Sequence, residues 1–185
     1  MDECWFSRFA QPQLHSWAPP QQALHVVQRV PVKGDPDPPA LACYGALRAD
    51  TSQVILHSAS GQPNSQQTWF FLSGLLLIAR REHKRVLVVI WDNATWHKSK
   101  TLKAHIRAYN HTARLTGDPR LITFRLPTRS PWLNPIEPHW AHAKRAVCEP
   151  DGQLSPHVLR VRLHDYFDVP PFLWHAFKTG APTLH

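Results

Sequence analysis

Apolar and polar residues along this chain follow two different periods, one typical of strands and the other of helices. Residues 41–48 and 53–57 are short apolar runs joined by a polar turn, which predicts an antiparallel hairpin. The apolar residues between positions 66 and 81 recur at helical spacing, which predicts a helix. Residues 84–92 form a nearly continuous apolar run, as expected of a central strand that helices cover on both faces.

The second half of the chain continues the alternation of helices and strands. A helix, a strand and two further helices are predicted at residues 98–114, 121–126, 135–147 and 155–167. A hairpin followed by this alternation is typical of a mixed α/β sheet flanked by helices. Residues 3–40 are rich in proline, and we expect them to be irregular apart from a candidate strand at residues 24–32.

Composition and charge indicate a folded, basic protein. A hydrophobic content of 43% argues against global disorder, and 185 residues are enough for one domain with its own core. The formal net charge of +8 favours a polyanionic partner such as nucleic acid. Charge alone fits a solvated basic surface equally well, so the kind of partner depends on the motifs.

Cysteines and hydropathy bear on the compartment. The three cysteines, Cys4, Cys43 and Cys148, lie far apart without a paired framework, as in proteins of reducing compartments. The most apolar run, residues 69–79, is too short to span a bilayer. We therefore expect a cytoplasmic protein without a membrane partner.

Two acidic residues occupy positions that suit a metal site. Asp92 ends the apolar run, and Glu137 lies in the first turn of a helix predicted to start at Asn134, with Pro135 as its first helical residue. Carboxylates at a strand end and at a later helix start can meet at one sheet edge, and oxygen ligands suit a hard divalent cation. Taken singly, the same residues fit a turn and a helix cap, so the metal interpretation depends on their combination.

A longer motif surrounds both acids. Residues 126–140 read Leu-Pro-Thr-Arg-Ser-Pro-Trp-Leu-Asn-Pro-Ile-Glu-Pro-His-Trp, and upstream Asp92-Asn93 is followed by His97. Together these residues resemble the catalytic core of the DDE transposases, in particular the mariner-like superfamily and its bacterial insertion-sequence relatives. The resemblance implies a ribonuclease H-like fold.

The resemblance also suggests a position for the family's first acid. An Asp-Glu pair before an aromatic residue and a later Trp-Ala-Pro match Asp2-Glu3 and residues 17–19. In the family this Asp ends a central strand, but only Met1 precedes Asp2, so we expect the first strand and the N-terminal helix-turn-helix domain to be absent. Glu3 is a weaker candidate because successive residues of a strand point to opposite faces. Three other carboxylates are alternatives to Asp2, namely Asp35, Asp37 and Asp50.

The resemblance implies a transposase catalytic domain that cleaves DNA and transfers DNA strands with divalent metal. Asp2, Asp92 and Glu137 would hold two Mg²⁺ or Mn²⁺ ions, one beside the attacking oxygen and one beside the leaving oxygen. The residues expected to contact DNA are Lys98, Lys100, Arg129, Lys144 and Arg145. The polar residues expected to support the acids are Asn93, His97 and Asn134, although His97 fits a simple helix-start histidine equally well.

Domain organisation and competing functions complete the expectations. We expect an endonuclease core at residues 1–150 and a C-terminal helix and tail at residues 151–185. The 44 residues between Asp92 and Glu137 exceed the family's usual interval, which predicts an extended loop around residues 110–120. The expected partners are DNA and a second copy of the chain, with no small-molecule substrate. Two alternatives stay open, an inactive transposase remnant that binds DNA non-specifically and a ribonuclease H-like nuclease acting on RNA–DNA hybrids or junctions.

Overall fold

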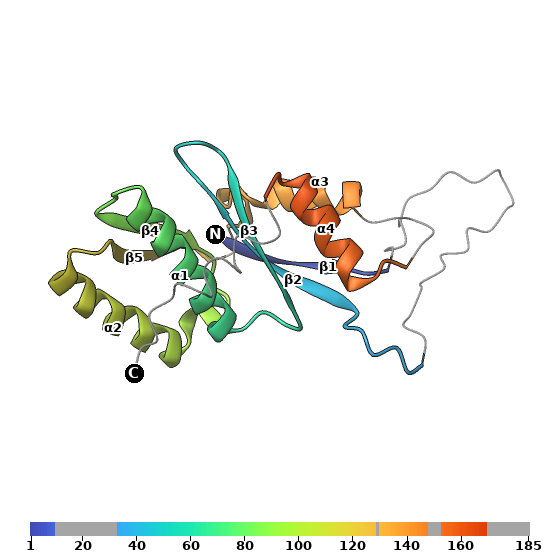
Figure 1. Cartoon of the computed structure of the whole chain (residues 1–185), viewed down its shortest axis with the longest axis horizontal. Helices are drawn as coiled ribbons and strands as arrows, with labels where there is room; N and C mark the ends of the chain where they lie inside the picture. The colour runs from blue at the N-terminus through green and yellow to red at the C-terminus, as the bar shows by residue number, and fades with distance from the viewer. Residues whose placement is uncertain (10–32, 129, 148–152, 170–185) are drawn as a thin grey trace, which may run out of the picture.

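The computed structural model describes residues 1–9, 33–128, 130–147 and 153–169, which form two β-sheets and four α-helices (Figure 1). The strands are β1 (Asp2–Ser7), β2 (Ala40–Leu47), β3 (Val54–Ser60), β4 (Val86–Trp91) and β5 (Arg120–Arg125). The helices are α1 (Ser65–Arg81), α2 (Lys100–Thr116), α3 (Glu137–Val147) and α4 (Pro156–Tyr166), with two 3-10 turns, η1 (Trp96–Lys98) and η2 (Pro131–Leu133). The expected mixed α/β architecture is confirmed.

The strands form one antiparallel and one parallel group. β1, β2 and β3 pair antiparallel in that order, and the predicted hairpin is β2 with β3. β4 and β5 pair in parallel, and α2 is the crossover between them. Parallel strands end at the same sheet edge, and here the amide of Leu126 donates to the carbonyl of Trp91 at 2.8 Å. The loops that follow β4 and β5 therefore lie side by side.

A first strand is present, contrary to the expectation that it would be absent. β1 begins at Asp2, which lies opposite Gly45 in the register with β2, and it ends at Ser7. The amine of Met1 donates to the carbonyl of Ile90 at 2.7 Å, which brings the start of β1 against β4. The prediction failed because this short strand is specified by pairing with β2, a long-range contact that local sequence does not encode. The candidate strand at residues 24–32 lies outside the described residues.

Helix starts follow the polar capping residues of the sequence. The side chains of Asn64, Ser99 and Ser155 each accept a backbone N–H in the first turn of α1, α2 and α4. α3 differs from the prediction, because its regular helix begins at Glu137 and not at Asn134. The intervening residues form a turn in which the N–H of Glu137 donates to the carbonyl of Asn134 at 3.1 Å. Among the described residues, no helix is both long enough and apolar enough to cross a membrane.

The extended loop predicted around residues 110–120 is wrong. α2 continues to Thr116, and Gly117 ends it in the left-handed conformation with a φ of 76°. The side chain of Asn110 bonds both the N–H and the C=O of Leu121 at 2.8 Å, which ties α2 to β5. Residues 110–116 therefore belong to a helix that is hydrogen-bonded to the sheet.

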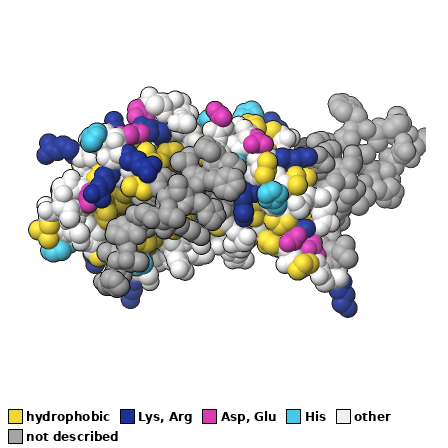
Figure 2. Space-filling view, in the orientation of Figure 1, with side chains coloured by type: hydrophobic (Ala, Val, Ile, Leu, Met, Phe, Trp, Pro, Cys, Tyr) yellow, Lys and Arg dark blue, Asp and Glu magenta, His cyan; other side chains and the backbone are white. Residues whose placement is uncertain are grey.

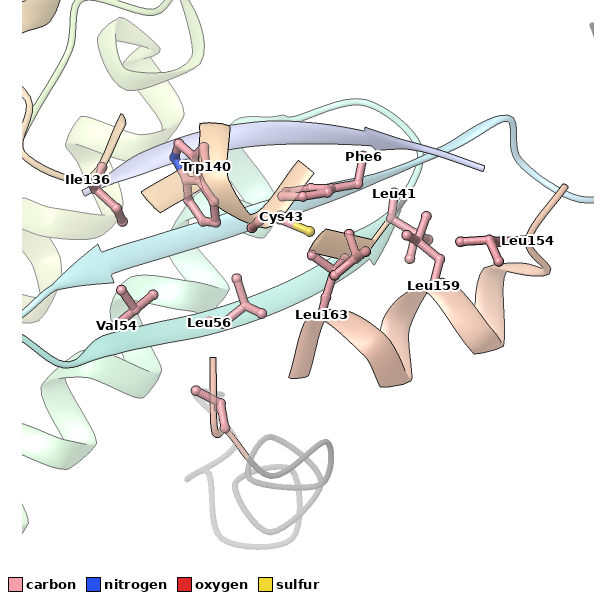
Figure 3. Packing of buried hydrophobic residues seen from close by; sticks show 13 residues of the cluster. Phe6, Leu41, Cys43, Val54, Leu56, Ile136, Trp140, Leu154, Leu159 and Leu163 are labelled. Atoms are coloured by element: carbon pink, nitrogen blue, oxygen red, sulfur yellow. The ribbon is translucent and has the colours of Figure 1, made fainter. Parts of the chain in front are cut away.

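The antiparallel sheet separates two apolar clusters. On one face α3 and α4 pack over the sheet, and the close-up view shows Trp140 and Leu163 near Cys43 and Leu159 beside Leu41 (Figure 3). On the other face α1 covers the sheet and continues onto β4, with a second cluster that includes Tyr44, Phe71, Leu72, Leu76, Val89 and Trp91. Alternate residues of each strand therefore belong to different cores, as the pleat of a strand requires.

One face of the β4–β5 pair is not covered by the described residues. Val89 and Trp91 of β4 are buried against α1 and its neighbours, but the alternate residues Val88 and Ile90 are 52% and 51% exposed. On β5, Phe124 is 56% exposed. The expectation that helices cover residues 84–92 on both faces is therefore wrong for the described part of the chain.

Candidate active site

One cavity brings two of the predicted acids together. Asp92 directly follows β4, and Glu137 is the first residue of α3. Both line the same cavity, with Asn93, Ala94, Leu126, Pro127, Ser130 and Asn134. The side-chain amide of Asn93 donates to the carbonyl of Leu126 at 2.6 Å, which joins the loops after the two parallel strands. The cavity therefore lies at the sheet edge where the sequence predicts a metal site.

Asp2 is tied to the helix that carries Glu137. Trp140, one turn further along α3, donates its indole N–H to Oδ2 of Asp2 at 3.1 Å. Burial, together with the negative charges of Glu3 and Asp92, raises the pKa of Asp2 to about 6. The first position of β1 is thus close enough to feel the charge of Asp92. Asp2 is not among the residues that line the cavity, so it lies beside it and not on its wall.

Glu3 lies on the opposite face of β1 from Asp2, as strand alternation predicts, and it is buried there. Its carboxylate accepts the indole N–H of Trp96 at 3.2 Å, and its other oxygen is 3.0 Å from Nε2 of His97. The side chain of Glu3 is only 2% exposed. These contacts from η1 leave Glu3 enclosed, in contrast to the acids at the cavity.

His97 links Glu3 to Asp92. Its ring is fully buried and stacks on Trp91 with centroids 4.6 Å apart and an interplanar angle of 8°. Nδ1 lies 2.8 Å from Oδ1 of Asp92, an ion-pair distance, although the contact is not aligned as a straight hydrogen bond. The same Oδ1 accepts the N–H of Ala94 at 2.9 Å.

The charges of Glu3, His97 and Asp92 shift the pKa values of His97 and Asp92. Burial lowers the pKa of His97, but the contacts with Asp92 and Glu3 outweigh burial and raise it to about 9. The contact with His97 is the largest cause that lowers the pKa of Asp92. An imidazolium between two carboxylates is therefore the favoured state near neutral pH.

A divalent cation fits the donor set at the cavity. Asp92 has a side chain that is 46% exposed, and Glu137 is exposed at the same opening. The pKa of Asp2 is raised by burial first and then by the negative charges of Glu3 and Asp92, and a cation would offset those charges. Carboxylate oxygens are the ligands that Mg²⁺ and Mn²⁺ prefer. Glu3, Asp92 and His97 also offer ligand atoms within 4.8 Å of one another, but these atoms already contact each other.

Four of the five residues predicted to contact DNA lie on the surface. Lys98, Lys100, Lys144 and Arg145 are exposed. Lys98 is close enough to contribute to the lowered pKa of Asp92, and the amine of Lys144 lies 6.0 Å from the ring centroid of Phe6. Arg129 lies outside the described residues. Figure 2 shows Lys and Arg side chains spread over the visible face and not gathered in one patch.

Sequence reasoning did not find the tryptophans and Glu3 as partners of the acids. Trp140 lies three residues after Glu137, a spacing that places both on one helix face and could have indicated a shared site. No local spacing could have indicated that Trp96 and His97 reach Glu3, more than ninety positions earlier. Asn134 is buried at the cavity wall, where its carbonyl accepts the first N–H of α3.

Comparisons with known proteins found one matching family and several solved structures with the same fold. A family model described as DDE superfamily endonuclease matches residues 1–152 of this chain. Three solved structures share the fold: the Mos1 strand transfer complex (18% identity, TM-score 0.59), the Mos1 transposase paired-end complex with left transposon end (17%, 0.62) and a pre-cleavage Mos1 transpososome (14%, 0.62). The ribonuclease H-like fold expected from the sequence is confirmed.

The three structural matches cover nearly all of this chain but only part of each neighbour. Each match covers 96% of this chain, and the covered shares of the neighbours are 49%, 50% and 51%, so this chain spans about half the length of those proteins. A search of the curated proteins found no match. At these identities, the likeness to the solved structures concerns the fold.

Proposed function

We propose that this chain, which belongs to the DDE superfamily endonuclease family, is a transposase catalytic domain that cleaves DNA and transfers DNA strands. The observation that carries the proposal is the shared cavity of Asp92 and Glu137, with Asp2 tied to the same helix through Trp140. These acids come from distant parts of the chain, and a purely structural role for each would not require them to converge.

Asp2, Asp92 and Glu137 would hold Mg²⁺ or Mn²⁺, two ions in all. When bound, such ions lower the pKa of the attacking water or hydroxyl and neutralise charge on the leaving oxygen. The chain's own residues arrange the acids. Trp140 occupies Oδ2 of Asp2, and His97 with Ala94 occupies Oδ1 of Asp92. Within the described residues, the contacts of Asp92 fall on Oδ1, which leaves its Oδ2 for the ions.

DNA is the proposed substrate. The three solved neighbours are transposase complexes named for strand transfer, paired ends and the state before cleavage, and the second of these contains a transposon end. We transfer DNA binding to this chain because its net charge is +8 and because exposed basic residues lie on η1, α2 and α3, namely Lys98, Lys100, Lys144 and Arg145. Such residues neutralise phosphates, and binding of this kind weakens steeply with salt.

The remaining expectations become part of this proposal. We assign residues 1–150 to the endonuclease core, in line with the family match over residues 1–152, and residues 151–185 to a C-terminal helix and tail. A second copy of the chain is the proposed protein partner, because the named neighbours include a paired-end complex. We place the protein in the cytoplasm, in contact with DNA.

A nicking and strand-transfer assay with Mg²⁺ or Mn²⁺ tests the proposal. Asp92→Asn and Glu137→Gln should each abolish DNA cleavage, because either substitution removes a negatively charged ligand while keeping side-chain size. Asp165→Asn, a change to an exposed carboxylate on α4, is the matched control and should retain activity. Equal activity in all four proteins would remove the proposal.

The alternative function, an inactive remnant, predicts a different result. In that case the unchanged protein would bind DNA with a steep salt dependence but would neither cleave it nor bind Mn²⁺ at the acids. The observation that keeps this alternative open is that Asp2 is not among the residues that line the cavity of Asp92 and Glu137. Mn²⁺ binding measured by electron paramagnetic resonance separates the two.

A further inference from the structure

Glu3 is a buried acid for which the proposed reaction has no use. Both of its oxygens are occupied by ring nitrogens, one by Trp96 at 3.2 Å and the other by His97 at 3.0 Å. It lies on the face of β1 that packs toward Tyr44, away from Asp2. Burying a carboxylate that is only 2% exposed costs free energy unless hydrogen-bonding or charged partners compensate for the lost contact with water.

His97 is held in place from three sides. Glu3 contacts Nε2, Trp91 stacks on the ring plane, and Asp92 meets Nδ1 at 2.8 Å. An imidazole confined in this way cannot rotate without breaking at least one of these contacts. The position of Nδ1 relative to Asp92 is therefore fixed by residues of β1 and β4.

Asp92 needs such an anchor because it stands in a loop. It follows β4, its side chain is 46% exposed, and the last torsion of an aspartate is soft. Oδ1 takes both the contact with His97 and the N–H of Ala94 at 2.9 Å. Within the described residues, Oδ2 is left as the oxygen for a cation.

We propose that Glu3 is a positioning residue: it holds His97, and His97 in turn fixes the carboxylate of Asp92 with Oδ2 toward the metal. The inference rests on the proposed function, since it assumes that Asp92 binds a cation. Groups that orient a ligand in this way commonly change metal affinity by about 10- to 100-fold when they are removed.

The competing interpretation is that Glu3 is itself a metal ligand. Glu3, Asp92 and His97 offer ligand atoms within 4.8 Å of one another, which is close enough for one ion. Against this stand the burial of Glu3 and the occupation of both its oxygens. The two interpretations differ in the number of ions bound when Glu3 is changed.

A matched pair of substitutions at His97 separates positioning from general stability. The side-chain amide of His97→Asn can reach the place of Nδ1 and contact Asp92, whereas that of His97→Gln reaches the place of Nε2 and contacts Glu3. We expect Mn²⁺ affinity, measured by electron paramagnetic resonance on the whole chain, to fall about 10-fold in His97→Asn, which keeps the contact with Asp92 but loses the hold of Glu3. It should fall further, by about 100-fold, in His97→Gln, which loses the contact with Asp92 itself. Equal affinity in the two variants, at equal folded fraction, would overturn the proposal.

Glu3→Gln tests the contact between Glu3 and His97. Trp96 and His97 contact different oxygens of Glu3, and a glutamine has an amide nitrogen in place of one of them, so it cannot accept at both positions. We expect about 10-fold weaker Mn²⁺ binding with an unchanged number of ions. Loss of one ion in Glu3→Gln would show that Glu3 is a ligand and would overturn the proposal.

A measurement without metal distinguishes failure of this inference from failure of the proposed function. The ring signals of His97 in a nuclear magnetic resonance spectrum should broaden or shift in Glu3→Gln and in Asp92→Asn. Unchanged signals in Glu3→Gln would refute the positioning role whatever the metal results. Changed signals in a protein that binds no Mn²⁺ would support the contact of Glu3 with His97 and would refute the proposed function.

Discussion

Gly45 of β2 leaves room for the tryptophan that holds Asp2. A Cβ atom added at this position would lie 2.9 Å from Cδ1 of Ile136 and closer still to Cη2 and Cζ2 of Trp140. Trp140 cannot simply move aside, because its ring meets Phe6 and Phe167 edge-on with centroids 6.0 and 5.6 Å away. Gly45→Ala therefore forces the indole away from β2.

The magnitude follows from these distances. To restore a normal carbon–carbon contact of about 3.5–4 Å, the indole must shift by roughly 1 Å. Overpacking of this kind costs about 1–3 kcal/mol. The shift also lengthens the 3.1 Å bond to Asp2, and a hydrogen bond to a charged group contributes about 1.5–3 kcal/mol. Together these contributions predict that Gly45→Ala lowers the free energy of unfolding by about 2.5–6 kcal/mol.

Urea unfolding of a double-mutant cycle tests this reasoning. Trp140→Phe removes the two indole atoms that would clash, so Gly45→Ala should cost at least about 1 kcal/mol less in that background. Gly61→Ala is the matched control, because it has open space around it and a φ of 85°, so its cost comes from backbone strain and should not depend on residue 140. Equal costs of Gly45→Ala in both backgrounds would refute the proposed clash.

Two further predictions concern pH and a buried ion pair. Since the pKa of His97 is raised from 6.5 to about 9, its charged form stabilises the fold fully below about pH 6.5, and this contribution is lost as pH rises through about 9. The free energy of unfolding should therefore fall over that range in the original protein, and a His97→Gln protein that shows the same fall would contradict the assignment. Arg8 is 3% exposed and contacts Asp35 at 3.1 Å and the carbonyl of Leu154 at 2.9 Å. Arg8→Met should cost about 1–3 kcal/mol in thermal or urea unfolding, because the buried carbonyl of Leu154 loses its donor, and a loss below about 0.5 kcal/mol would show that this contact adds no stability.

The sequence predicted the helices and strands whose ends are marked by local turn or capping residues. The hairpin of β2 and β3 has a polar turn between apolar runs, and α1, α2 and α4 have polar caps at their first turn. The position of Asp92 at a strand end and of Glu137 at a helix start followed from the same patterns. The motif around Glu137 then suggested which acids would meet.

The features that could not be predicted depend on partners far away in the sequence. β1 pairs with β2, and Asn110 of α2 bonds Leu121 of β5, so both elements depend on contacts that local sequence does not reveal. Alternation correctly placed Glu3 on the face opposite Asp2, but its role depends on His97 and Trp96. An apolar run such as residues 84–92 likewise does not indicate which of its faces finds a partner.

The face of β4 and β5 that the described residues leave exposed has a thermodynamic consequence for any stability measurement on this chain. Val88, Ile90 and Phe124 are exposed there, and each square ångström of apolar surface that is not buried forgoes about 25 cal/mol of stabilisation. A segment or a neighbouring molecule that came to rest on these strands would gain that free energy without rearranging them. Melting temperatures of the described fold with this face wet should accordingly be lower limits for the same fold with the face covered.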